Sequence, residues 1–284
     1  MSPPVPRSTP HPSAPLWPVL QAPSHWRTID FISDLHMQAS EPATFAAWHD
    51  FMCKTPADAV FILGDLFEVW VGDDVVETLP ADAPVGFEAR CAQIIKTASL
   101  HSEIYFIHGN RDFLLGPAFA SLSGMTLLGD PCVLEFAGER WLLSHGDALC
   151  LDDTDYMKFR DLVRSKEWQR DFLAKSLTER QSIALALRHQ SETRKRHETK
   201  YADLDASATC EWLRRANANT LIHGHTHRAG CHDLNQGMRR IVLTDWDLSA
   251  LTPRAEILRL SIEQAGQQKL ATFKRISALP HCEN

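Results

Sequence analysis

The sequence TIDFISDLH, residues 28–36, holds the pattern that decides the fold, because a short apolar run is followed at once by polar residues. The same pattern recurs in AVFILGD (59–65), IYFIHGNRD (104–112), WLLSHGD (141–147) and TLIHGHTH (220–227). β-Branched and aromatic residues dominate these runs, which predicts five strands. Each predicted strand is followed directly by side chains suited to metal or phosphate chemistry.

Helix-like stretches at 42–54 and 85–99 lie between the first three runs. This alternation of strand and helix predicts an α/β (α+β) fold with helices outside a sheet. Loops at the carboxyl ends of such strands lie at one edge of the sheet, so the polar clusters can meet in space. Three later runs, at 240–244, 255–262 and 270–276, are typical of strands that close a second sheet.

Composition limits the class of protein. The 284 residues allow one large or two small domains, and 44% hydrophobic with 23% charged residues excludes a wholly disordered chain. The net charge of −7 argues against bulk affinity for nucleic acid, which normally requires a basic surface. The seven cysteines form no CxxC pair, which predicts reduced, buried thiols and excludes a disulfide framework or a thiolate zinc site.

The first 26 residues contain eight of the sixteen prolines. Proline fixes φ and removes a backbone donor, so we predict a disordered Pro-rich tail over 1–26 and one folded domain over 27–284. The segment lacks the apolar core of a signal peptide, and no apolar run approaches the roughly 18 residues of a membrane span. We therefore expect a cytoplasmic protein.

A helical insert is predicted at about 155–205, where apolar residues recur four positions apart, as in Phe159 with Val163 and Trp168 with Phe172. Residues 156–200 contain twelve Lys and Arg against six Asp and Glu, a net charge of +6. Two interpretations are open. The insert is a cap whose apolar face receives lipid chains or a membrane surface while its cations meet phosphates. Alternatively, it is an amphipathic helical pair with a solvated charged face.

The polar clusters contain the donor types of a metal centre. Asp34 and His36, two residues apart in an extended stretch, can bind one ion together, and HGHTH places three imidazoles within five residues. Taken singly, each motif has an ordinary alternative: a solvated surface pair, an Asp that caps a turn, or a buried hydrogen-bonded histidine. Their occurrence together, each at a strand end, favours a metal site. Asn110 suits it, because an amide oxygen adds no negative charge beside an anionic substrate.

The series DLH, GD, GN, SHGD and GHTH resembles the signature of the calcineurin-like metallophosphoesterases, over about residues 34–227. The resemblance implies a two-sheet β-sandwich flanked by helices, with two divalent metal ions at the strand ends, and it favours Mn²⁺. The implied ligands are Asp34, His36 and His227 for the first ion, Asn110, His145 and His225 for the second, and Asp65 as a bridge. His223 has no ligand role in that pattern and is expected to pack or hydrogen-bond.

Four longer strings resemble the diphosphatases of lipid A biosynthesis: FILGDLFEVWVGDD (61–74), FIHGNRDFLLG (106–116), LLSHGDALCLDD (142–153) and IHGHTHR (222–228). That resemblance implies hydrolysis of UDP-2,3-diacylglucosamine by attack of a metal-held water on the α-phosphorus, giving UMP and the diacyl sugar 1-phosphate. It also implies a peripheral position at the cytoplasmic face of the inner membrane. The implied substrate contacts are Asn110, Arg111, Asp153, Ser191, Lys195 and His225, although the spacing from Ser191 to Lys195 departs from the family pattern.

Arg111 stands where many calcineurin-like enzymes have a histidine that can act as a general acid. The leaving group of a diphosphate is a phosphate whose second pKa is about 6, so it departs without a proton. An arginine can hold phosphate oxygens bidentately and offset charge in the transition state, which makes Asn110 and Arg111 the catalytic candidates. Two alternatives stay open: a phosphoesterase for cyclic nucleotides, phosphoproteins or nucleic acid, and a non-catalytic protein that binds metal or phospholipid.

Overall fold

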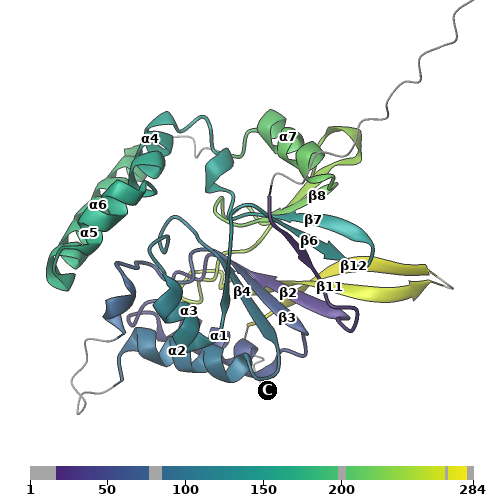
Figure 1. The fold of residues 1–284 in the computed structure, drawn as a ribbon, viewed down its shortest axis with the longest axis horizontal. Helices are drawn as coiled ribbons and strands as arrows, with labels where there is room; N and C mark the ends of the chain where they lie inside the picture. The colour runs from purple at the N-terminus through teal and green to yellow at the C-terminus, as the bar shows by residue number, and fades with distance from the viewer. Residues whose placement is uncertain (1–16, 77–84, 198–202, 266–267, 280–284) are drawn as a thin grey trace, which may run out of the picture.

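Two six-stranded sheets pack face to face in the computed structural model, which describes residues 17–76, 85–197, 203–265 and 268–279 (Figure 1). Side chains are described in these ranges except at 189–197, 264–265 and 268–269. The strand order is β1-β6-β7-β8-β10-β9 in the first sheet and β12-β11-β2-β3-β4-β5 in the second. The predicted two-sheet sandwich with flanking helices is confirmed.

The elements have the following bounds. The first sheet consists of β1 (Val19–Gln21), β6 (Cys132–Phe136), β7 (Glu139–Leu143), β8 (Thr220–His223), β9 (Gly230–Asp233) and β10 (Arg239–Val242). The second consists of β2 (Thr28–Ile32), β3 (Ala59–Leu63), β4 (Glu103–Ile107), β5 (Thr126–Leu128), β11 (Glu256–Ala265) and β12 (Gln268–Ser277). The helices are α1 (Pro42–Lys54), α2 (Phe87–Ala98), α3 (Pro117–Ser123), α4 (Thr154–Val163), α5 (Lys166–Leu173), α6 (Leu177–His197) and α7 (Ala206–Ala216).

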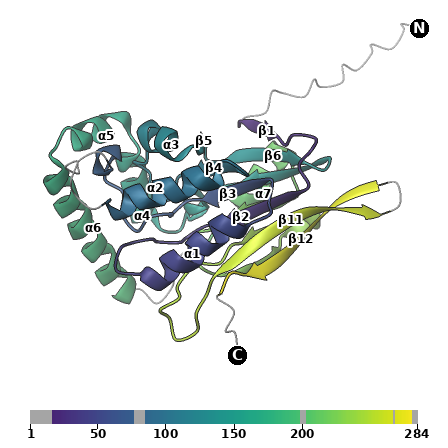
Figure 2. The same ribbon diagram turned by 90° about the horizontal axis from the view of Figure 1, so that it is seen from below.

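Side-chain alternation along the strands divides the core into layers. In β3, Phe61 belongs to the cluster between the two sheets, whereas Val60 and Ile62 belong to the cluster beneath α1, α2 and α3. Figure 2 shows α1 and α2 lying along the second sheet. The outer face of the first sheet is covered by α7, whose Leu213 packs with Leu221 of β8. Helices therefore cover both outer faces of the sandwich.

Parallel pairing brings the functional loops to one edge. Strands β2, β3 and β4 pair in parallel in the second sheet, and β7 pairs in parallel with β8 in the first. The five strands predicted before the polar clusters are all present, and α1 has the predicted bounds of 42–54. The carboxyl ends of these strands carry the five clusters.

The prediction of a disordered tail over 1–26 is wrong for residues 17–26. Strand β1 pairs in parallel with β6, and Trp26 is 1% exposed within the core between the sheets. Proline is tolerated here because β1 is an edge strand, where a missing donor interrupts only one side of the ladder. The carbonyl oxygen of Pro18 even accepts a hydrogen bond from Val133 N–H at 2.9 Å. The folded domain thus begins before residue 27, and residues 1–16 lie outside the described residues.

Three helices, α4, α5 and α6, occupy the segment for which a helical insert was predicted. They stand apart from the other helices in Figure 1. Trp168 and Phe172 of α5 stack at 4.6 Å between ring centroids and pack against the cluster beneath α1 to α3. None of the helices that the structure describes has the length and apolar character needed to cross a bilayer. The prediction of buried cysteines is wrong for Cys53 and Cys231, which are exposed, and for Cys210, which is half-buried. Cys282 lies outside the described residues.

Candidate active site

The loops that carry the polar clusters have an unusual backbone. φ is positive at Asp34 (54°), His36 (47°), Asp65 (54°), His225 (67°) and His227 (54°). These are five of the eight non-glycine residues with positive φ in the described part of the chain. A left-handed conformation costs about 1–2 kcal/mol per residue, and it persists mainly at functional sites where the surroundings enforce it. The surrounding structure therefore holds these loops in a conformation that directs the five side chains into the site.

Glycine lets the loops approach one another closely. A Cβ at Gly64 would lie 2.6 Å from the Cα of Gly109 and from Nδ1 of His145. A Cβ at Gly109 would collide with the loop that follows β3. Asp112 then joins the two loops, since its buried carboxylate accepts hydrogen bonds from the N–H groups of Gly109 (2.8 Å) and Leu66 (2.7 Å). The sequence motifs GNRD and GD thus become one rigid unit, a role for Asp112 that was not predicted.

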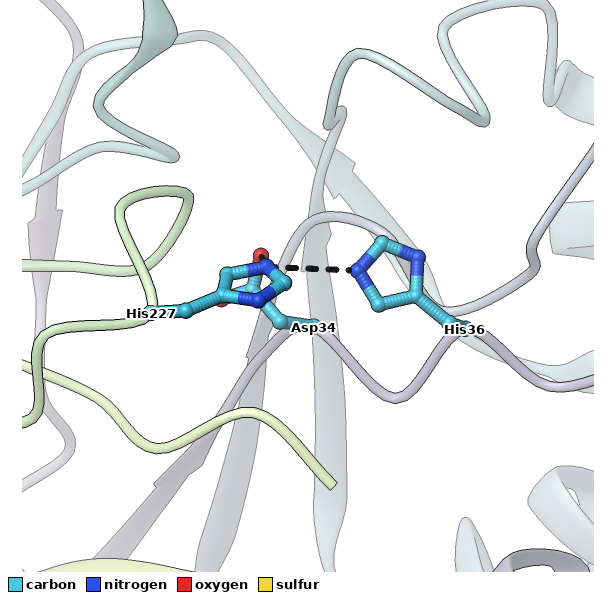
Figure 3. Close-up of side chains that lie close together, drawn as sticks. All are labelled: Asp34, His36 and His227. Carbon is cyan, nitrogen blue, oxygen red and sulfur yellow. Dashed lines mark hydrogen bonds and ion pairs between the residues drawn. The ribbon is translucent and has the colours of Figure 1, made fainter. Parts of the chain in front are cut away.

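Asp34, His36 and His227 form the first group of donors (Figure 3). Nε2 of His227 lies 3.5 Å from Oδ1 of Asp34 and 3.4 Å from Nε2 of His36. The carboxylate of Asp34 is fully buried and accepts hydrogen bonds from the hydroxyl of Ser33 (2.6 Å) and the N–H of His225 (3.0 Å). The structure brings the three predicted ligands of the first ion together.

Asn110, His145 and His225 form the second group. Oδ1 of Asn110 lies 3.0 Å from Nε2 of His145 and 2.8 Å from Nδ1 of His225. Asp65 lies between the two groups, with Oδ2 3.7 Å from Nε2 of His145 and 3.9 Å from Nε2 of His36. All seven residues predicted as ligands therefore lie close together, and their roles as ligands, including that of Asp65 as a bridge, stay predictions.

This donor set fits divalent metal ions. Asp34 and Asp65 are 0% and 2% exposed, and within the described residues neither has a lysine or arginine partner at salt-bridge distance. If the histidines are neutral, as metal ligands must be, the two buried carboxylates have no cation beside them, and burial without one is costly. A divalent ion would supply the missing positive charge. Carboxylate oxygen, amide oxygen and imidazole nitrogen are donors that divalent ions accept.

The buried histidines differ in basicity. Burial opposes protonation of His145, but the carboxylates of Asp65, Asp34 and Asp147 outweigh it and raise the pKa of His145 to about 9. Burial, and then the charge of His145, lower the pKa of His225 to about 3. A metal ion at this position would displace the proton of His145, because a metal ligand must be a neutral imidazole.

His223 is separate from the donor groups. It is fully buried, and burial lowers its pKa to about 4. Its Nδ1 lies 2.8 Å from the carbonyl oxygen of Gly224. This geometry agrees with the packing and hydrogen-bonding role that was expected for it.

Glu68 is a site residue that the sequence did not reveal. Its carboxylate lies 2.9 Å from Nδ1 of His36, 3.2 Å from Nε of Arg188 and 3.8 Å from the guanidinium of Arg111. Burial raises the pKa of Glu68, but these three partners outweigh that effect and lower it. The contact with Nδ1 orients His36 so that Nε2 faces the donor cluster. The backbone of Arg111 is also held, because its backbone N–H donates a hydrogen bond to Oδ1 of Asp65 at 2.8 Å.

Two cavities meet at the donor cluster, and both are lined by Glu68, Asn110, Arg111 and His225. The polar cavity, of about 400 Å³, extends to the start of α1 and to the loop at 245–254. The apolar cavity, of about 390 Å³, lies between α4, α5 and α6 and the loops that follow β3 and β4. Its apolar wall consists of Val69, Trp70, Val71, Phe113, Leu114, Phe159, Trp168, Phe172, Ala184 and Leu187.

The predicted substrate contacts in the cap fall in two classes. Asp153 lines the apolar cavity, and its carboxylate caps α4 by accepting a hydrogen bond from Tyr156 N–H at 2.9 Å. Ser191 and Lys195 lie on α6, but their side chains lie outside the described residues. Their contacts stay a prediction.

Asp147 connects the cap to the site, which was also not predicted. Its buried carboxylate accepts hydrogen bonds from the hydroxyl of Tyr156 and from Nε of Arg160, both at 2.7 Å. The ring of Tyr156 in turn stacks on His225, with 5.9 Å between centroids. Helix α4 is thereby fixed against the second group of donors. The aspartate of SHGD was the available signal, but its partners come from a different element.

Such a cluster, buried at strand ends and open to two cavities beside an arginine, defines a metal-dependent phosphoester hydrolase. The model of the calcineurin-like phosphoesterase family matches residues 27–229. The chain belongs to this family, as its signature suggested.

Curated relatives share much of the sequence. The UDP-2,3-diacylglucosamine hydrolase of Aeromonas hydrophila is 45% identical over 222 residues, which cover 76% of this chain and 89% of the relative. The protein of the same name from Chromobacterium violaceum is 43% identical over 227 residues, 77% of this chain and 90% of the relative. That from Shewanella loihica is 38% identical over 245 residues, 84% and 95% of the two chains.

Proposed function

We propose that this protein hydrolyses the diphosphate bond of UDP-2,3-diacylglucosamine to UMP and 2,3-diacylglucosamine 1-phosphate. The observation that carries the proposal is the apolar cavity that opens onto the donor cluster at Asn110 and Arg111. A lipid-linked diphosphate needs both features, because its phosphates must reach the metal ions while its acyl chains leave water. The names of the relatives point to the same substrate.

Two divalent ions would be held by the two groups of donors. Asp34, His36 and His227 would hold the first, Asn110, His145 and His225 the second, and Asp65 both. Oxygen and imidazole donors without thiolate suit manganese, iron or zinc. Among these we propose Mn²⁺, which the resemblance to the calcineurin-like phosphoesterases favours. When bound, the ions would supply Lewis acidity to the phosphoryl oxygens and lower the pKa of water at the site.

The surrounding residues orient the diphosphate. Arg111 lines both cavities, so its guanidinium can reach the phosphate on either side of the scissile bond and offset the charge that develops there. Glu68 restricts the rotamers of Arg111, and Asp65 fixes its backbone. His225, held by Tyr156, would contact the phosphate from the cap side. The chain needs no nucleophile of its own for this reaction.

The apolar cavity would take the acyl chains. Each buried methylene contributes about 0.8 kcal/mol, so a cavity lined by Phe159, Trp168 and Phe172 favours a lipid over a bare sugar. Asp153 in its wall, with Ser191 and Lys195 on α6, would contact the glucosamine or the diphosphate. These contacts would position the sugar phosphate at the donor cluster.

A comparison of substrates tests this function. In detergent micelles the protein should hydrolyse UDP-2,3-diacylglucosamine and lose the activity to a chelator, while UDP-glucosamine without acyl chains should be a much poorer substrate.

Phe159→Ala should raise KM for the diacyl substrate about three- to tenfold, since a partly exposed contact with the chains is lost. Leu122→Ala on α3, 49% exposed and outside the cavity wall, is the control and should leave KM unchanged. Equal rates with and without acyl chains, or preference for cyclic nucleotides, would contradict the proposal.

We also propose that the helices α4 to α6 contact the inner membrane from its cytoplasmic face. Three exposed leucines on these helices support this: Leu162, Leu173 and Leu185, at 55%, 43% and 61% exposure. Substituting the three by serine should reduce cosedimentation with anionic phospholipid vesicles severalfold, because apolar area no longer enters the bilayer. The control replaces three exposed leucines elsewhere: Leu100, Leu122 and Leu270. Equal losses in both variants would refute a membrane face on the cap.

A further inference from the structure

The polar cavity shares only Glu68, Asn110, Arg111 and His225 with the apolar cavity. The rest of its wall comes from the donor groups, from the start of α1 and from the loop at 245–254. At about 400 Å³ it falls within the roughly 300–1,000 Å³ typical of small-molecule sites. A molecule bound at the donor cluster can therefore extend into two cavities of opposite character.

The outer wall of the polar cavity is preformed. Asp247 and Arg254 exchange two backbone hydrogen bonds of 2.9 Å, which close the loop between them. Leu248 N–H donates to Oγ1 of Thr44 at 3.3 Å, which ties the loop to α1. These bonds hold the loop against α1, so residues of the fold itself form the outer wall of the cavity.

Carboxylates outnumber cations in this outer part. Glu41, Asp245 and Asp247 line it together with Arg254, which already lies 2.7 Å from Asp245 and 3.5 Å from Asp247. The carboxylate of Glu41 does not cap α1, and it has no hydrogen bond or ion pair with any residue that the structure describes. Carboxylates accept hydrogen bonds from hydroxyl and N–H groups and repel phosphate. The outer cavity therefore suits a hydrogen-bond donor that carries no negative charge.

We propose that the polar cavity binds the nucleoside half of the substrate, with Glu41 accepting a hydrogen bond from a ribose hydroxyl; this rests on the function proposed above. The substrate then lies across the donor cluster, with its ribose and uracil between α1 and the loop at 245–254 and its acyl chains under α4 to α6. The carboxylates of Glu41, Asp245 and Asp247 accept the neutral nucleoside and repel the sugar phosphate, which disfavours binding of the substrate in the reverse direction. The two cavities thereby fix the orientation of the substrate at the donor cluster, with the nucleoside on one side and the acyl chains on the other.

The test measures the affinity of the manganese-loaded full chain for UMP by calorimetry. Ser249→Trp, in the cavity wall, should weaken UMP binding at least about tenfold by filling the space. Leu251→Trp introduces the same bulk on the same loop at a fully exposed position outside the wall, and should leave the affinity within about twofold. Glu41→Gln exchanges a charged acceptor for a neutral amide oxygen, which forms a weaker hydrogen bond with the ribose hydroxyl. It should therefore weaken UMP binding about three- to tenfold, and should leave the affinity for 2′,3′-dideoxyuridine monophosphate unchanged.

Two results separate this subsite from the proposed function. Hydrolysis of UDP-2,3-diacylglucosamine by the unmodified protein, with normal UMP affinity in Ser249→Trp and Glu41→Gln, would place the nucleoside elsewhere and overturn the subsite alone. Absence of both hydrolysis and UMP binding in the unmodified, metal-loaded protein would overturn the proposed function and the subsite with it. Loss of UMP affinity in Ser249→Trp, with the ribose-dependent loss in Glu41→Gln, supports the subsite.

Discussion

Asp65→Ala is expected to lower kcat/KM on the order of 10³-fold or more, the largest loss among single substitutions of the seven proposed ligands. Its carboxylate lies between the two donor groups, 3.7 Å from His145 Nε2 and 3.9 Å from His36 Nε2, so both ions lose a ligand at once. Metal ions contribute several kcal/mol of charge stabilisation in the transition state, and each 1.36 kcal/mol is a factor of ten in rate. Elemental analysis should find about two metal ions per unmodified chain and a clear deficit in the variant.

Two further variants make this result specific. Asp65→Asn keeps an acceptor for the N–H of Arg111 but removes the charge, so it should be nearly as inactive. Asp50→Ala removes an exposed carboxylate on α1, paired with Lys54 at 2.5 Å, and should leave activity and metal content unchanged. Full metal content and activity in Asp65→Ala would refute a bridging role.

Arg111→Ala is expected to lower kcat/KM about 10²- to 10³-fold, because a donor aimed at the developing phosphate charge is lost. Arg111→Lys should recover only part of this, since an ammonium group cannot hold two phosphate oxygens in the same fork. Glu68 keeps His36 and Arg188 as partners in either variant, so the donor cluster should retain its metal ions.

The leaving group distinguishes charge neutralisation from simple binding. The nitrophenyl ester of UMP releases a singly charged phenolate, so the loss caused by Arg111→Ala should be several times smaller than with the lipid diphosphate. Arg214→Ala, an exposed arginine paired with Glu211 on α7, is the control and should be neutral. Equal losses with both substrates would show that Arg111 only positions the nucleotide.

Local pattern was enough to predict the strands and the polar residues that gather at their carboxyl ends. Strand β3 has the predicted bounds, because an unbroken β-branched and aromatic run buried on both faces has few alternatives. All seven predicted ligands meet, because each stands directly after a strand and the parallel strands end at one edge. By contrast, β1 was missed because the prolines around it are a local signal for disorder, whereas its pairing with β6 is a long-range interaction.

The remaining parts of the site depend on contacts between distant elements. Glu68 matters because it meets His36 and Arg188, and Asp147 because two side chains of α4 turn toward it. Neither carboxylate differs in sequence from an ordinary loop residue. The polar cavity combines the start of α1 with the loop at 245–254, so no single stretch of sequence could indicate it.

A single turnover of UDP-2,3-diacylglucosamine with manganese in ¹⁸O-labelled water tests the proposed reaction most directly. Water should attack the α-phosphorus next to uridine, in line with the departing sugar phosphate. Mass spectrometry should then find one ¹⁸O in UMP and none in the 2,3-diacylglucosamine 1-phosphate. Label in the sugar phosphate would contradict the site of attack, and absence of cleavage by the metal-loaded protein would contradict the function itself.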